Sequence, residues 1–351
     1  SSFTANDGNG RDNNPTDPGD HTAADECGSG EPASNSSWHG THVMGTIGAA
    51  SNNGTGVAGI DWNAKLLPVR ALGKCGGSSL DIIDAIYWSA GLSVPNTPVN
   101  NNPAKVINMS LGGTGSCDIG TQDAINAAVA AGSTIVVAAG NETVDAINSS
   151  PANCNNVVVV AATDWNAQIA LYSNYGAVVD IAAPGGDNFF GTEGTVASAY
   201  NAGTTTASTD NYAYLQGTSM ATPHVACVVS LMLAKNSALT PAQVESFLKS
   251  SARAFPVYTG NAATYNCTTA DCGDGLLDAH AAVSAVTNTP DTPPNNFSFT
   301  AQTGVTQNSV RTSNTIAISG INTPAAIRVS GGVYSLGCNN SAFTNAPSTI
   351  N

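Results

Sequence analysis

The stretch Gly217-Thr218-Ser219-Met220-Ala221-Thr222-Pro223-His224-Val225-Ala226 runs directly into the apolar segment Cys227–Ala234. Gly217 permits a sharp turn of the backbone, and Pro223 falls in the early turns of a helix, where a missing N–H costs least. The pattern therefore predicts a buried helix with Ser219 at its start. A serine there lies at the positive end of the helix dipole, close to backbone donors. Gly-x-Ser by itself predicts a capping serine before a buried helix.

The composition indicates a chain with a large core and a negative charge. Of its 351 residues, 42% are hydrophobic and 10% are charged, and no apolar run is long enough to span a bilayer. Acidic residues outnumber basic ones by 24 to 10, which gives a formal net charge of −14. Because no basic patch could neutralise phosphates, we expect neither nucleic acid nor membrane as a partner. The balance suits calcium and cationic substrates, and we expect a monomer.

Short apolar strands alternate with helical patterns through the middle of the chain. The pattern predicts strands at 64–72, 106–113, 134–141, 157–161 and 178–182, and helices at 79–90, at 120–132 and from Thr240 onward. This alternation is typical of a parallel sheet with crossover helices, so the predicted fold class is α/β. Asn141 stands at the carboxyl end of its strand, where ligand sites lie in open α/β sheets.

Eight cysteines without paired Cys-x-x-Cys spacing predict disulfides formed in an oxidising compartment. Cys267 and Cys272 bracket a short loop and are expected to pair. Cys227, in the apolar helix, is expected to be a buried free thiol. Cys338 has no obvious partner. Four further cysteines in loops allow three connectivities, of which we favour Cys27–Cys75 with Cys117–Cys154.

Three segments together resemble the motifs of the subtilisin-like serine proteases, the subtilase family. They are the string around Ser219, the segment Ser37-Trp38-His39-Gly40-Thr41-His42-Val43, and the strand end Ala138-Ala139-Gly140-Asn141. The resemblance implies that Ser219 is the nucleophile and His39 the general base and acid. It also implies that Asn141 donates a side-chain N–H to the oxyanion. We interpret His42, one helical turn after His39, as structural.

The same resemblance implies a three-layer subtilisin-like fold, in which helices cover both faces of a mostly parallel sheet. The implied function is that of a secreted bacterial serine endopeptidase acting on proteins or peptides. A further edge of the substrate pocket is implied at Ala183-Pro184-Gly185. The residues implied to bind the substrate are Ser110, Leu111, Gly112, Gly113, Ala138, Ala139 and Gly140.

The family also uses an aspartate at the end of an apolar strand, and nothing before His39 matches that motif. We therefore expect residues 1–286 to form the peptidase domain without its N-terminal part. Such a fragment is expected to be inactive or very weak, since losing this aspartate costs about 10⁴ in rate in known triads. Residues 287–296 have the composition of a linker. Residues 297–351 are predicted to form an incomplete β-rich domain of sandwich type, from period-2 patterning at 297–301, 314–321 and 326–336.

An acidic loop near the start of the chain is a candidate calcium site. Asp7, Asp12, Asp17 and Asp20 are spaced by glycine, asparagine and proline, and their oxygens suit a hard cation. The spacing is not that of an EF-hand, so a solvated acidic loop is an equal alternative. The subtilase resemblance favours calcium here, and it also points to calcium in the loop 52–60.

Two other functions fit parts of the sequence. A non-catalytic protein of the subtilase fold would act in adhesion through its β-rich domain, and an active-site serine probe would distinguish it. An α/β-hydrolase esterase uses Gly-x-Ser-x-Gly and places its serine before its histidine. Here Gly217-Thr218-Ser219-Met220-Ala221 lacks the final glycine, and His39 comes first.

Overall fold

The structure, a computed structural model, describes residues 2–259, 265–287, 325–327 and 348–350. The chain divides into two compact units, Ser1–Thr287 and Asn288–Asn351. In the second unit the described residues form two antiparallel strands, β9 (Ala325–Ile327) and β10 (Ser348–Ile350). Cys338, the strands predicted at 297–301 and 314–321, and most of 326–336 lie outside the described residues. The linker and the sandwich-type domain therefore stay predictions.

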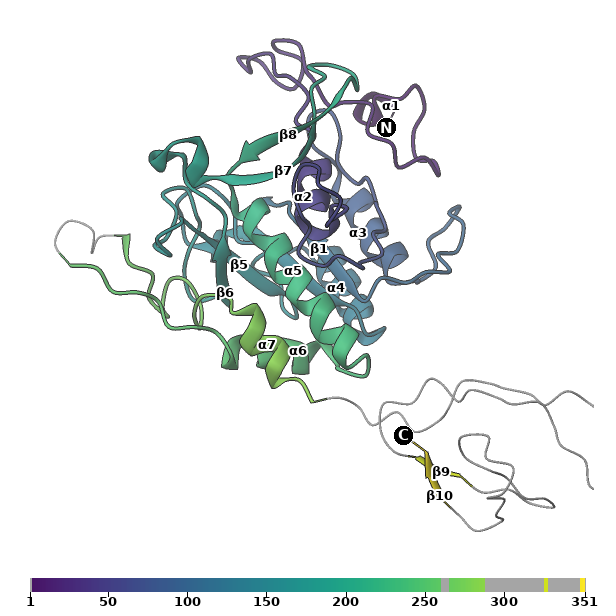
Figure 1. The fold of residues 1–351 in the computed structure, drawn as a ribbon. Coiled ribbons are helices and arrows are strands. Elements are labelled where there is room, and N and C mark those ends of the chain that lie inside the picture. The colour runs from purple at the N-terminus through teal and green to yellow at the C-terminus, as the bar shows by residue number, and fades with distance from the viewer. Residues whose placement is uncertain (1, 260–264, 288–324, 328–347, 351) are drawn as a thin grey trace, which may run out of the picture. The chain divides into compact units, whose positions relative to one another are not determined.

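A four-stranded parallel sheet forms the centre of the first unit (Figure 1). In spatial order its strands are β1 (Val106–Met109), β3 (Thr134–Ala138), β5 (Val158–Thr163) and β6 (Ile181–Pro184). Val137 of β3 pairs with Met109 on one side and with Val159 on the other. β3 and β5 are buried along their whole length, which is why they read as continuous apolar runs. The predicted α/β class is confirmed.

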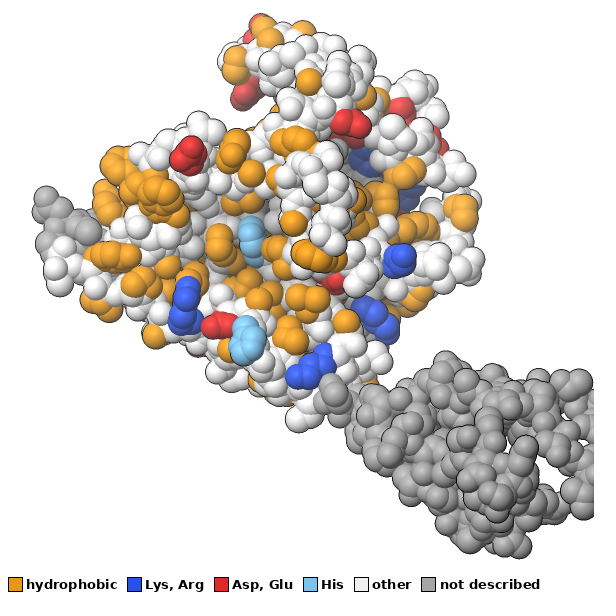
Figure 2. All heavy atoms as spheres, viewed as in Figure 1, with side chains coloured by type: hydrophobic (Ala, Val, Ile, Leu, Met, Phe, Trp, Pro, Cys, Tyr) orange, Lys and Arg blue, Asp and Glu red, His pale blue; other side chains and the backbone are white. Residues whose placement is uncertain are grey.

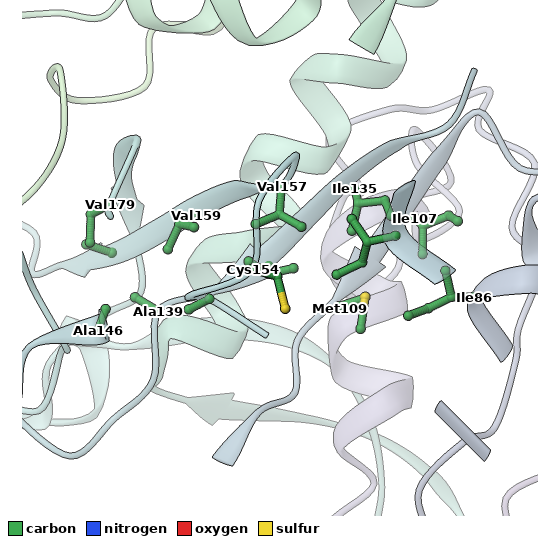
Figure 3. Packing of buried hydrophobic residues seen from close by; sticks show 14 of the residues in the cluster. Ile86, Ile107, Met109, Ile135, Ala139, Ala146, Cys154, Val157, Val159 and Val179 are labelled. Carbon is green, nitrogen blue, oxygen red and sulfur yellow. The ribbon is translucent and has the colours of Figure 1, made fainter. Parts of the chain in front are cut away.

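Alternate side chains of one strand enter two different cores. Ile135 and Val137 pack with residues of α3 (Ser79–Ser89) and α4 (Ile119–Ala130), and Figure 3 shows part of this cluster. Val136, which lies between them, packs on the opposite face with residues of α5 (Thr218–Lys235). Successive side chains of a strand point to opposite faces, so one strand serves both cores. The result is the predicted three-layer arrangement of helices, sheet and helices.

The helix α5 is the main element on the second face. It packs against all four strands of the sheet and against α7 (Ala279–Ala285), which in turn contacts α6 (Pro241–Ser250). Val225, Val229 and Met232 of α5 lie in the core, at the spacing that places residues on one helix face. Thr240 caps α6 and forms a capping box with Gln243, so this predicted helix start is confirmed.

The remaining elements of the first unit are short. Strands β7 and β8 form an antiparallel hairpin that packs against α2 (Figure 1). Among the helices that the structure describes, none has the length and hydropathy that crossing a bilayer requires. The bounds of these elements are α1 (Ser2–Ala5), α2 (His39–Gly48), β2 (Gly113–Thr114), β4 (Ser149–Ser150), β7 (Val196–Asn201), β8 (Asp210–Leu215), η1 (Ala146–Asn148), η2 (Asn188–Phe190) and η3 (Thr192–Gly194).

The cysteines pair in the favoured way. The structure contains the disulfides Cys27–Cys75, Cys117–Cys154 and Cys267–Cys272. Cys227 is free and buried, with its Sγ 3.6 Å from the carbonyl oxygen of Ile47 on α2. Burial raises the pKa of this thiol to about 12, so the reactive thiolate is scarce at neutral pH.

Two of the predicted strands need correction. Residues 64–72 form no strand, and the side chains of Leu66, Leu67, Val69 and Leu72 are 36% to 38% exposed. No strand within the described residues pairs with this segment, so no ladder of hydrogen bonds holds it extended. The strand predicted at 178–182 begins only at Ile181, because Val179 is held in a turn by a hydrogen bond from its N–H to Gly176 O.

His42 lies where α2 meets the β7–β8 hairpin, and its side chain is fully buried. Its Nε2 is 3.1 Å from Val196 O and 3.2 Å from Ala213 O, so Nε2 carries the proton and donates it to these carbonyls. Nδ1 is buried and finds no hydrogen-bond partner among the residues that the structure describes. A second proton on Nδ1 would have no acceptor, and burial accordingly lowers the pKa of His42. These contacts support its interpretation as a structural residue.

We expect the free energy of unfolding to fall as the pH drops below about 6.5, the pKa of an unfolded-state histidine. In that range the unfolded chain binds a proton at position 42 that the folded chain takes up only at lower pH, so acid favours unfolding. Urea unfolding at about pH 7.5 and about pH 5 measures the loss. His42→Gln, whose amide can donate to the same carbonyls, should lose less stability between the two conditions. Equal losses in both proteins would assign the effect to other groups.

Candidate active site

Ser219 is held in the first turn of α5, directly after a sharp bend at Gly217. Gly217 has a φ of 152°, which residues with a side chain rarely adopt, and its N–H donates to Gly185 O at 3.1 Å. The helix begins at Thr218 and has 18 residues. Ser219 is therefore its second residue, half-buried at the positive end of the helix dipole. The predicted helix start is confirmed.

The proline at position 223 explains how Ser219 is tied to the sheet. Proline has no N–H, so the carbonyl of Ser219, four residues earlier, cannot receive the usual helical hydrogen bond. Ser110, which follows β1, supplies the donor instead. Its Oγ donates to Ser219 O at 2.8 Å and accepts from Asn108 Nδ2 at 3.0 Å. In return, Ser219 Oγ donates to Ser110 O at 3.4 Å.

Asn141 follows the end of β3 and contacts the residue next to the nucleophile. Its Oδ1 accepts hydrogen bonds from the N–H of Thr218 at 2.8 Å and from Thr218 Oγ1 at 2.9 Å. A backbone N–H can only donate, so the amide atom that it meets must be the oxygen. The Nδ2 group of this exposed side chain is thereby left to donate to a ligand.

The loop that carries Asn141 is ordered by Asn174, a residue that the sequence did not single out. Asn174 is fully buried, and its Oδ1 accepts from the N–H groups of Glu142 and Val144, both at 3.0 Å. Its Nδ2 donates to Ala139 O at 3.0 Å and to Glu142 Oε2 at 2.7 Å. A buried network with its polar groups satisfied favours one conformation, so Asn174 positions the loop.

His39 is the first residue of α2, and its neighbours fix the start of this helix. Trp38 adopts a left-handed backbone with a φ of 45°, and its indole N–H donates to Gly203 O at 2.6 Å. The backbone N–H of His39 donates to Ser37 Oγ at 3.3 Å. Ser37 is held in turn by Asp20, whose carboxylate accepts from Ser37 N at 2.6 Å and from Ser37 Oγ at 2.7 Å.

The protonation state of His39 follows from its surroundings. Burial lowers its pKa and the charge of His42 lowers it further, whereas the carboxylate of Asp20 raises it. The imidazole is therefore neutral at pH 7, the form that a general base requires. Within the described part of the chain, the ring of His39 makes no hydrogen bond to a carboxylate or to Ser219 Oγ. α2 nevertheless packs against α5, and catalytic hydrogen bonds often form fully only with substrate.

The residues predicted to bind the substrate lie at or after the carboxyl ends of β1 and β3. Leu111 is half-buried, and Gly112 and Gly113 are exposed. Ala138 and Ala139 are buried within the first unit, so Gly140 is the member of that group that reaches the surface. Its N–H donates to Thr218 Oγ1 at 3.2 Å. Ser110 contacts the nucleophile's backbone, which gives it a positioning role besides the predicted one.

The four aspartates predicted to bind calcium do not form a common site. Asp7 pairs with Arg70 at 2.7 Å, and Asp20 holds Ser37. Asp12 and Asp17 each accept the backbone N–H two residues further on. No three His, Cys, Asp or Glu side chains in the described ranges are grouped as metal ligands would be. In the structure these carboxylates contact different partners, so calcium binding by this loop stays a prediction.

Comparisons with known proteins identify the family. Residues 5–280 match the model of the Subtilase family, Peptidase S8. An extracellular protease of Xanthomonas campestris pv. campestris is 52% identical over 286 residues, which cover 81% of this chain and 46% of the relative. An extracellular basic protease of Dichelobacter nodosus is 43% identical over 291 residues, which cover 80% and 45%. The chain thus spans about half the length of the curated relatives it matches.

Two solved structures of proteases are also similar to this chain. One of the proteases from Pseudoalteromonas arctica PAMC 21717 matches with a TM-score of 0.77 and 52% identity, over 82% of both chains. A cold-adapted subtilisin-like serine proteinase matches with a TM-score of 0.53 and 32% identity, over 71% of this chain and 78% of that one. The fold is therefore subtilisin-like, as predicted. Since the family model covers most of its residues, the chain belongs to the subtilase family.

Proposed function

We propose that this protein is a secreted serine endopeptidase that cleaves peptide bonds through an acyl-enzyme on Ser219. The observation that carries the proposal is the link through Thr218, which follows Gly217 and precedes Ser219. Its N–H and Oγ1 both bind the Asn141 side chain, so the nucleophile and the donor Nδ2 are held by adjacent residues. Membership of the subtilase family supports the activity. The extracellular relatives and the three disulfides support secretion.

The residues act in a simple order. Ser219 Oγ attacks the carbonyl carbon of the scissile bond while the neutral His39 takes up its proton. The oxyanion accepts from Asn141 Nδ2 and from the N–H of Ser219, which lies in the first turn of α5 and has no helical acceptor. His39 then protonates the leaving amine, and later activates the water that releases the acyl group. We assign no residue of the described chain to the role of orienting His39.

The substrate chain is placed by the ends of the strands. We place its acyl side along Leu111, Gly112, Gly113 and Gly140, at the β1–β3 end of the site. These residues are exposed or half-buried and follow the strands that deliver Ser110 and Asn141. The substrates are proteins or peptides. Calcium has no part in these steps, and its binding stays a prediction.

A non-catalytic adhesion protein of the same fold is the competing function. The family match removes the α/β-hydrolase esterase. A non-catalytic protein would have no need of a neutral His39, nor of an Asn141 whose oxygen is held so that its donor stays available. An active-site serine probe such as a fluorophosphonate distinguishes the two functions, because it labels only an activated serine.

The first test is Ser219→Ala in the full-length protein. We expect kcat to fall by about 10⁶, the loss known for a subtilisin that lacks its nucleophile, and fluorophosphonate labelling to disappear. The melting temperature should change little, because the hydrogen bond from Ser110 Oγ goes to the backbone of residue 219 and survives. A variant that kept its peptidase activity would show that another residue is the nucleophile.

The second test separates the two ends of the Asn141 amide. Asn141→Ala should lower kcat about 10²–10³-fold with little change in KM, the loss known for one oxyanion donor in a subtilisin. Asn141→Asp keeps an oxygen for the two bonds from Thr218 but removes the Nδ2 donor, so it should lose at least as much. If Asn141→Asp regained the activity that Asn141→Ala lost, the residue would serve only to position Thr218. A change confined to KM would assign it to substrate binding.

A further inference from the structure

We propose that three aromatic side chains, Trp165, Phe189 and Phe190, bind an apolar side chain of the substrate on the leaving-group side of the scissile bond. We call these residues the aromatic cluster. The inference rests on the proposed function and extends it to the choice of substrate.

Two of the three rings of the aromatic cluster are largely exposed, and Phe190 is half-buried. Trp165 is 64% and Phe189 is 73% exposed to solvent. The ring of Phe190 lies between them, with centroid distances of 5.6 Å to Trp165 and 5.2 Å to Phe189. The segment 185–194 lies at the left of Figure 1, and Figure 2 shows hydrophobic side chains gathered on that part of the surface. Contiguous exposed apolar groups of this kind mark binding sites.

A tight turn after β5 presents Trp165. The carboxylate of Asp164 is buried, and its Oδ1 accepts from the N–H of Asn166 at 2.8 Å and of Gln168 at 2.9 Å. The N–H of Asp164 donates to Gln168 O at 2.9 Å and closes the turn. The indole is therefore carried outward on an ordered backbone rather than on a loose loop.

A second buried carboxylate presents Phe189 in the same way. Asp187 accepts from the N–H of Phe189 at 2.9 Å and from the N–H of Leu171 at 2.8 Å. Leu171 is itself partly exposed and adds to the apolar surface. Aromatic side chains on ordered turns lose little conformational entropy when they bind, so they suit a recognition site.

Hydrogen bonds attach the loop after β6 to the residues before the nucleophile. The N–H of Gly217 donates to Gly185 O at 3.1 Å, and the N–H of Asn188 donates to Gln216 Oε1 at 2.6 Å. Phe189 therefore directly follows a residue that is bonded to a position three residues before Ser219. The loop that carries Phe189 is thereby tied to the segment that leads to Ser219.

The order of the strands indicates the direction in which the substrate chain runs across the site. Ser110, Asn141, Trp165 and Phe189 follow β1, β3, β5 and β6, which is the order of the sheet. Strands lie about 4.8 Å apart, so β5 and β6 lie about 10 and 14 Å from β1. An extended peptide advances about 3.3 Å per residue, so about four residues reach from one end of this edge to the other. With the acyl side at the β1–β3 end, the leaving-group side extends toward the aromatic cluster.

The test uses two quenched fluorescent peptides that are identical up to the scissile bond. One carries phenylalanine and the other serine at the second and third positions after that bond. The values of kcat/KM are measured for the full-length protein, for Phe189→Ala and for Trp165→Ala. Trp62→Ala is the matched control, because Trp62 is 62% exposed and adjoins Asp61, whose carboxylate binds Ser230 in the distal half of α5.

We expect the native protein to prefer the phenylalanine peptide about five- to tenfold, the contribution of a contact between aromatic side chains. Phe189→Ala and Trp165→Ala should each reduce this ratio toward one, whereas Trp62→Ala should leave it unchanged. The proposal is overturned if the ratio survives in both cluster variants, or if they slow both peptides equally.

A binding measurement separates this proposal from the proposed function. Ser219→Ala protein is titrated with the same two peptides by calorimetry, with and without Phe189→Ala. Tighter binding of the phenylalanine peptide that depends on Phe189 supports the aromatic cluster even if neither peptide is hydrolysed, an outcome that would refute only the endopeptidase. Equal affinities for the two peptides refute the cluster whatever the activity.

Discussion

The missing amide hydrogen of Pro223 is the constraint on which the site depends. It leaves the carbonyl of Ser219 without a helical partner, and the hydroxyl of Ser110 takes that place from the end of β1. An unpaired carbonyl costs about 1–3 kcal/mol when fully buried, and part of that cost is avoided here because the part-buried hydrogen bond joins the start of α5 to the end of β1. Thr218 adds a second connection, to Asn141 after β3. Two strand ends and one helix start thereby fix one another's positions.

The electrostatics of the site follow from what surrounds each group rather than from the net charge. The chain carries a formal charge of −14, yet the candidate nucleophile meets a helix N-terminus and an amide donor. Burial keeps His39 neutral, and Asp20 acts on it while its two oxygens are bound to Ser37. Two further buried carboxylates, those of Asp164 and Asp187, accept backbone N–H groups and so stabilise turns. These three aspartates thus order the backbone of segments around the site.

Features that depend on local pattern could be predicted, and features that depend on distant contacts could not. A few consecutive residues suffice to predict β3, the helix start at Gly217 and the cap at Thr240. Asn174 was missed because its partners lie about thirty residues earlier, and an asparagine in a loop reads as a turn residue. The hydrogen bond from Ser110 to Ser219 joins residues 109 positions apart, so neither local sequence pattern predicts it. The segment 64–72 has the apolar pattern of a strand, but a pattern cannot supply a pairing partner.

The continuity of α5 has a consequence for motion. Ser219 shares this helix with Val225, Val229 and Met232, which lie in the core. The first turn of the helix is also tied to the ends of two strands, so it belongs to the same cooperative unit as the sheet. Local opening that displaced the serine would have to break those ties, and its free energy would approach that of global unfolding. Any mobility needed for substrate entry and product release must then come from segments outside this unit.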